Sequence, residues 1–182
     1  MRTFFLYLLL IIAYCQFTSC HSPSAEKCFN VAILNCNTIH DFAGRGLFRE
    51  MESPSVKMVN GDVNNLVAMK RKEMVEAKIE TVATNYNKVK QLKEMEDTKE
   101  MLRASLALYE YVLPVYKQEY MELARLYDEG ASEESVTSYI ESIQDRYYSG
   151  FAGLYDQMVA AGKLYAGKHN IQVNWDVRTS PR

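Results

Sequence analysis

Residues 98–129 carry the pattern that most constrains the fold, because apolar side chains recur there at heptad spacing over four consecutive heptads. Two rows sustained over this length predict a long amphipathic helix that packs against other helices through a narrow apolar stripe. Pro114 lies inside the pattern and predicts a kink near residues 110–114, since proline removes one helical hydrogen bond and clashes with the preceding turn. The two rows are Leu102, Tyr109, Tyr116 and Leu123, and Leu106, Leu113, Tyr120 and Tyr127.

Two neighbouring segments have the same periodicity. Residues 62–95 place valines at positions 75, 82 and 89, and residues 133–167 carry apolar side chains three and four positions apart. At 1.5 Å per residue, each of the three segments makes a helix of about 50 Å. Matched lengths and short connections predict an all-α fold, in which residues 62–182 form an antiparallel three-helix bundle with long helices.

Local signals mark the expected ends of these helices. Asp62 is expected to cap the first helix, and a change of heptad register near residues 96–98 predicts the break before the second. Gly130 is expected to end the second helix in the left-handed conformation, and Ser132 to cap the third. Two glycines inside the third helix are expected to allow the close approach of a neighbouring helix: Gly150 and Gly153.

Residues 28–61 have no helical period and hold glycines and prolines, so they are expected to form an irregular segment packed on the bundle. Alternating apolar residues from Phe29 to Ile33 are typical of a strand. A disulfide between Cys28 and Cys36 contradicts a strand, because it needs Cα atoms within about 7 Å and eight extended steps span about 26 Å. We favour the disulfide, with a tight reversal of the chain. Residues 171–175 alternate again and predict a short extended tail that buries Trp175.

The first twenty residues predict export. Arg2 is followed by an almost wholly apolar stretch, residues 4–15, which is shorter than the roughly 20 residues of a membrane span and fits a secretory signal peptide over residues 1–19. The sequence Phe17-Thr18-Ser19-Cys20 resembles the lipobox of bacterial prolipoproteins. This resemblance implies that Cys20 is acylated and becomes the first residue of the mature protein, followed by a polar tether over residues 20–27. The alternatives are an ordinary secretory signal, which leaves a soluble secreted or periplasmic protein, and a retained anchor.

The charge balance argues against a nucleic-acid partner. Loss of Arg2 with the signal peptide leaves 20 of the 21 basic residues against 23 acidic ones, a net charge of −3. Nucleic-acid binders normally show a basic surface. The basic triplet Lys70-Arg71-Lys72 is interpreted as a solvated helix face.

A polar site is a second hypothesis. His40 beside Asp41 pairs a base with a carboxylate, and Arg45 and Arg49 follow with side chains suited to an anion. The sequence contains no phosphate-binding glycine loop, no GxSxG or HExxH motif, no EF-hand loop and no CxxCH, so no cofactor and no metal are expected. The spacing of Cys28 and Cys36, with His40 as the nearest histidine, also argues against zinc.

Tyrosine is unusually frequent, and ten of the 13 tyrosines fall in residues 98–129 and 133–167. They are expected to form a tyrosine-rich seam between the second and third helices. The alternative is an aromatic groove open to a glycan, a peptide or a partner helix. Tyr111 and Tyr148 lie off the expected core rows, so they are the candidates for an exposed aromatic surface.

These observations predict a non-catalytic, lipid-anchored protein of the cell envelope, a helical-bundle protein that binds an unidentified protein or glycan or serves in assembly or adhesion. In this interpretation the lipid on Cys20 holds it to the membrane. The alternative is a secreted, non-lipidated small-ligand binder or hydrolase that uses the region of His40, Asp41 and Arg45. A third alternative is a secreted protein of stress or lysis.

Overall fold

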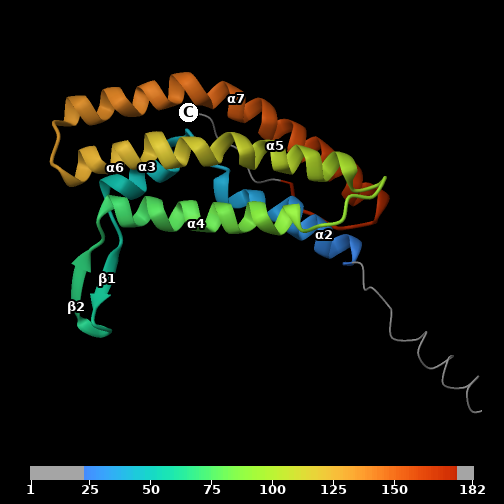
Figure 1. Cartoon of the computed structure of the whole chain (residues 1–182), viewed down its shortest axis with the longest axis horizontal. Helices are drawn as coiled ribbons and strands as arrows, with labels where there is room; N and C mark the ends of the chain where they lie inside the picture. The colour runs from blue at the N-terminus through green and yellow to red at the C-terminus, as the bar shows by residue number, and fades with distance from the viewer. Residues whose placement is uncertain (1–22, 176–182) are drawn as a thin grey trace, which may run out of the picture.

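The computed structural model describes residues 23–175 (Figure 1). The predicted signal peptide and Cys20 lie outside the described residues. The elements in chain order are α2 (Ala25–Ala32), the 3-10 helix η2 (Leu34–Ile39), α3 (Arg45–Glu52), β1 (Val56–Val59), β2 (Asp62–Ala68), α4 (Arg71–Lys90), α5 (Lys99–Val115), the π-helix η3 (Tyr116–Tyr120), α6 (Met121–Asp128) and α7 (Glu133–Lys168).

The structure is mostly helical, with 71 % helix and 7 % strand. The long helices run in alternating directions: α4, then the rod formed by α5, η3 and α6, then α7 (Figure 1). A three-helix bundle is not confirmed, because α2, η2 and α3 also supply buried side chains to the same core and a two-stranded sheet is present.

The prediction of one helix over residues 62–95 is wrong in its first part. Asn60 and Gly61 have φ angles of 54° and 76°, and two consecutive left-handed residues reverse the chain in the way that a tight hairpin requires. Residues 62–68 therefore pair antiparallel with β1. The helix starts at Arg71, where the Asp128 carboxylate accepts the N–H groups of Arg71 and Lys72 at 2.9 and 3.0 Å. The valine row that suggested the longer helix lies within α4.

The second predicted helix, 98–129, corresponds to the continuous rod from Lys99 to Asp128. The regular α-helix is interrupted, but after the predicted position, because the π-helix η3 begins two residues beyond Pro114. The corner after the rod is as predicted. Gly130 has a φ of 72°, and the Ser132 hydroxyl accepts the N–H of Ser135 at 3.2 Å.

The N-terminal segment is regular rather than irregular, which corrects the prediction for residues 28–61. The alternation from Phe29 to Ile33 falls in helix α2 and the turn after it, so no strand forms, and α2 already begins inside the predicted tether. Cys28 and Cys36 are both free thiols. The Cys28 sulfur lies 3.8 Å from the Pro23 carbonyl oxygen, and the Cys36 sulfur lies 3.6 Å from the Ser105 hydroxyl. The predicted disulfide is therefore not formed.

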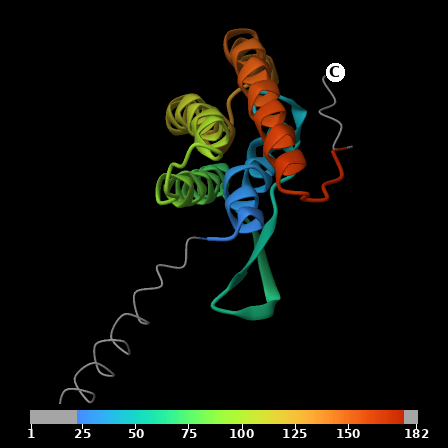
Figure 2. The ribbon, with the colours of Figure 1, turned by 90° about the vertical axis from the view of Figure 1, so that its right-hand side faces the viewer.

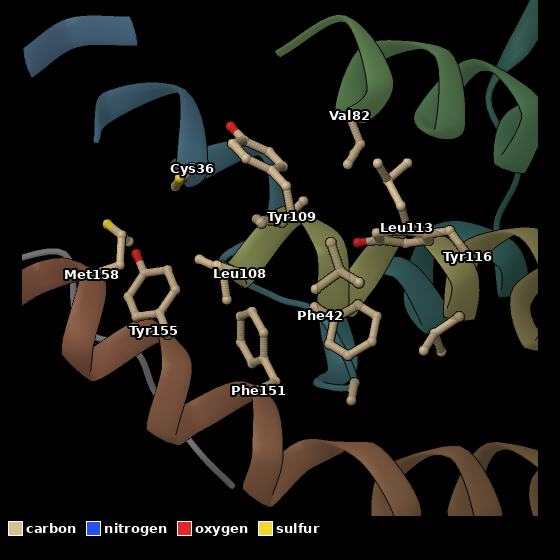
Figure 3. Close-up of a cluster of buried hydrophobic side chains, with 14 of the residues drawn as sticks. Cys36, Phe42, Val82, Leu108, Tyr109, Leu113, Tyr116, Phe151, Tyr155 and Met158 are labelled. Carbon is tan, nitrogen blue, oxygen red and sulfur yellow. The ribbon is translucent and has the colours of Figure 1, made fainter. Parts of the chain in front are cut away.

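Phe42 joins this segment to the long helices. Its ring lies 5.1 Å from the ring of Phe151 on α7 and 5.4 Å from that of Tyr116 on η3, measured between centroids (Figure 3). The next residue, Ala43, donates its N–H to the Tyr120 hydroxyl at 2.8 Å. The segment is thus part of the core and does not merely cover it.

The tail follows its prediction in part. Trp175 packs edge-on against Phe29, with 5.9 Å between ring centroids, so the tail lies along the helices as expected. Trp175 is only partly buried, however.

Within residues 23–175, no helix combines the length and the apolar character that crossing a bilayer requires.

The two glycines of α7 behave differently, which allows a matched test. A Cβ at Gly150 would lie 2.4 Å from the Tyr111 hydroxyl, whereas one at Gly153 would meet nothing within 4 Å. The close approach predicted for both is therefore confirmed for Gly150 and wrong for Gly153.

We expect Gly153→Ala to raise the free energy of unfolding by up to about 1 kcal/mol, because alanine favours the helix. Gly150→Ala should lower it by about 1–3 kcal/mol relative to Gly153→Ala, because Tyr111 must move. Urea denaturation of the two variants measures this difference. Equal stabilisation by both substitutions would contradict the packing of Tyr111 on α7.

Candidate functional site

The tyrosine seam is closed. Tyr109, Tyr116 and Tyr120 are at most 1 % exposed and lie in the core. Figure 3 shows Tyr109 and Tyr116 in this core. The two candidates for an open aromatic surface, Tyr111 and Tyr148, are both half-buried and packed on the core. The Tyr111 hydroxyl also donates to the Tyr147 carbonyl oxygen at 3.1 Å. Tyr111 is therefore tied to α7, and an aromatic binding surface at Tyr111 and Tyr148 stays a prediction.

At the outer edge of the tyrosine seam, the Glu119 carboxylate accepts hydrogen bonds from several side chains of α7. The hydroxyls of Tyr139 and Tyr147 donate to its carboxylate at 2.7 and 3.0 Å, and Arg146 donates two hydrogen bonds of 2.9 Å. The Arg146 guanidinium, helped by the two hydroxyls, holds the pKa of Glu119 below its ordinary value. Three side chains of α7 are thus tied to the π-helix of the neighbouring rod.

The predicted polar site is brought together only in part. His40 pairs with Asp41 at 3.2 Å through Nε2, and its Nδ1 lies 2.6 Å from the Asn37 carbonyl oxygen. Arg45 and Arg49 are exposed on α3, away from the cavity that the His40–Asp41 pair borders. The expected anion grip by two arginines beside the histidine is therefore absent from this cavity.

That cavity has a volume of about 130 Å³ and is bounded by the segment from η2 to α3, by α4 and by η3. Sequence reasoning missed three of its polar residues: Glu50 on α3, Lys78 on α4 and Tyr116 on η3. Burial lowers the pKa of Lys78, against the opposing effect of the Glu50 and Asp41 carboxylates. No local signal finds this group, because its members come from three elements. Among residues 23–175, no set of three or more His, Cys, Asp or Glu side chains is placed to hold a metal ion.

A second candidate surface is the β1–β2 hairpin, which projects from the helices (Figure 2). Every residue of its strands except Val59 is exposed, although most of them are apolar. Lys57 is on the face toward α4, where it forms an ion pair with Glu73. Two cross-strand pairs on the opposite face are apolar: Val56 with Ala68 and Met58 with Leu66. We call these four residues the apolar hairpin face.

The same four residues also border the open edges of the hairpin. The Met69 N–H donates to the Ser55 carbonyl oxygen at 2.8 Å across the two strands. Hydrogen-bonded and non-hydrogen-bonded pairs alternate along an antiparallel ribbon. The pairs of the apolar hairpin face are therefore the non-hydrogen-bonded ones, whose N–H and C=O groups point outward. The missed signal for this surface is Asn60-Gly61 between two alternating apolar runs, a common hairpin sequence.

Comparison of the chain with protein-family models, with curated proteins and with solved structures gives no match. The functional argument therefore rests on the geometry of the chain itself.

The Glu119 cluster predicts an acid-sensitive contribution to stability. Its folded-state pKa is lowered, so its contribution is complete above the unfolded-state pKa, near 4.5, and is lost as the pH falls through the lower folded value. Glu119→Gln should therefore cost most at pH 7 and progressively less below about pH 4.5. Urea denaturation between pH 7 and pH 3 measures this, with the exposed Glu141→Gln as the control. A cost that is independent of pH would contradict the ion-pair account.

Proposed function

We propose that this is a non-catalytic protein of the cell envelope, anchored by lipid on Cys20, whose projecting hairpin docks onto a protein partner. In this proposal the long helices form an antiparallel three-helix frame, with the N-terminal helices packed into it. The single observation that carries the docking function is the apolar hairpin face, which is exposed on a ribbon with two open edges.

The ribbon needs a partner for physical reasons. A two-stranded hairpin is marginally stable in water by itself, and independent stability usually takes a third strand or packing against a helix. Leu66 is 53 % exposed and Val56 is 59 % exposed, so the hairpin gains little from burial against the helices. A partner that covers this face would supply the missing apolar contact.

The chemistry favours an extended strand of a protein over a bilayer or a glycan. Unpaired backbone groups at the two edges are costly in hydrocarbon, where no water satisfies them. The apolar hairpin face offers no polar or aromatic side chain to a sugar. A partner strand with apolar side chains on one face would pair with the open edge and cover the apolar side chains together.

Site-specific photo-crosslinking in cells tests the docking surface. A photoreactive residue in place of Met58 should give an adduct with one protein. Leu66→Asn should weaken the adduct by removing apolar contact, and Ala68→Pro should weaken it by removing one outward N–H. The matched control is Leu164→Asn, which changes a leucine that is 77 % exposed on α7 and should have no effect. An adduct with lipid or with a second copy, the absence of any adduct, or equal loss in the control would overturn the docking proposal.

A separate experiment tests the anchor. Cells treated with an inhibitor of signal peptidase II should accumulate a precursor of higher mass, and Cys20→Ser should prevent the lipid modification. An unchanged mass and an unchanged membrane location would contradict lipidation and leave the docking proposal standing.

A further inference from the structure

We propose that the cavity between α3, α4 and η3 binds a small zwitterion that carries one ammonium and one carboxylate group, the chemistry of a short α-amino acid. The proposal is independent of the hairpin, because it rests on other side chains.

The inner wall of the cavity offers hydrogen-bond donors that have no acceptor in the described chain. Tyr116 is 1 % exposed and lines the cavity, and within residues 23–175 its hydroxyl forms no hydrogen bond. Lys78 is half-buried beside it, with no carboxylate of the described residues within ion-pair distance. A ligand carboxylate would accept from both the Lys78 ammonium and the Tyr116 hydroxyl.

The mouth of the cavity offers the opposite charge. The Asp41 side chain is 54 % exposed and is held in place by His40, and Glu50 on α3 is exposed as well. The Asp41 carboxylate also occupies the space above Gly46, where an added Cβ would lie 2.2 Å from its Oδ2. Two carboxylates at the mouth, one of them held by His40, suit a ligand ammonium group.

This separation of charge selects among ligand classes. A simple anion would meet Asp41 and Glu50 on its way in, and a simple cation would meet Lys78 at the inner wall. A zwitterion satisfies both ends. A water molecule takes about 30 Å³ of liquid, so the cavity volume of about 130 Å³ has room for a ligand of about four to six heavy atoms, such as glycine or alanine.

Isothermal titration calorimetry of the full mature chain in detergent tests the site. Glycine or alanine should bind with a dissociation constant of about 1 mM or below, and acetate and methylamine should bind at least about tenfold more weakly. Lys78→Met and Tyr116→Phe should each weaken binding of the amino acid about fivefold or more. Tyr116→Phe should leave the thermal midpoint unchanged or higher, since the hydroxyl that it removes has no partner.

Tyr109→Phe is the matched control, because it removes another fully buried hydroxyl that lies outside the cavity lining. It should leave the affinity unchanged. The proposal is overturned if neither amino acid binds, if acetate or methylamine binds as tightly, or if the affinity survives both cavity substitutions. An equal loss of affinity in Tyr109→Phe would overturn it as well.

Discussion

The packing of Phe42 between the rod and α7 is the contact on which the rest of the structure depends. Its ring meets aromatic rings of α5, η3 and α7, and the adjacent Ala43 is fixed by the Tyr120 hydroxyl. Burying one aromatic side chain of this kind is worth about 3–5 kcal/mol, judged by truncation to alanine. Because Phe42 comes from the N-terminal segment, this segment seals the space between the long helices.

Because the space between the long helices is filled, the groups proposed to bind a partner or a ligand lie outside it. Most of the tyrosines on the long helices are buried in the core or donate to Glu119 at its edge. The same segment continues through α3 into the hairpin, which lies outside the core. Phe42 also follows Asp41, so the contact that closes the core holds one carboxylate at the mouth of the polar cavity. The two proposed sites therefore depend on one packing arrangement.

The sequence predicted the elements whose signals are local and periodic. The heptad rows located the rod, and Gly130 and Ser132 located its corner, because a left-handed cap and a hydroxyl cap each need a particular residue type. Asn60-Gly61 is an equally local turn signal, but the expected cap at Asp62 placed the start of a helix beside it, so the hairpin was missed. A helical pattern and a hairpin turn signal overlap at this point. The left-handed φ angles of Asn60 and Gly61 show that the hairpin forms.

The candidate sites were less predictable because they depend on distant residues. His40 and Asp41 are adjacent in sequence and their pairing was expected, but Lys78 and Tyr116 reach the cavity only through packing of α4 and η3 against the N-terminal segment. Cys28 and Cys36 suggested a disulfide by number alone, whereas α2 and η2 direct the two thiols to different neighbours. Even a correct assignment of every helix would not have brought these groups together.

Amide hydrogen exchange at Ala43 tests the central claim most directly. If the N-terminal segment is part of the core, the Ala43 N–H, which donates to a buried tyrosine hydroxyl, should exchange only through global unfolding, as slowly as the amides near Tyr109 in α5. The hairpin amides should exchange much faster. Exchange at Ala43 as fast as at Val63 in the hairpin, while α5 stays protected, would show that the segment opens independently and would contradict the account.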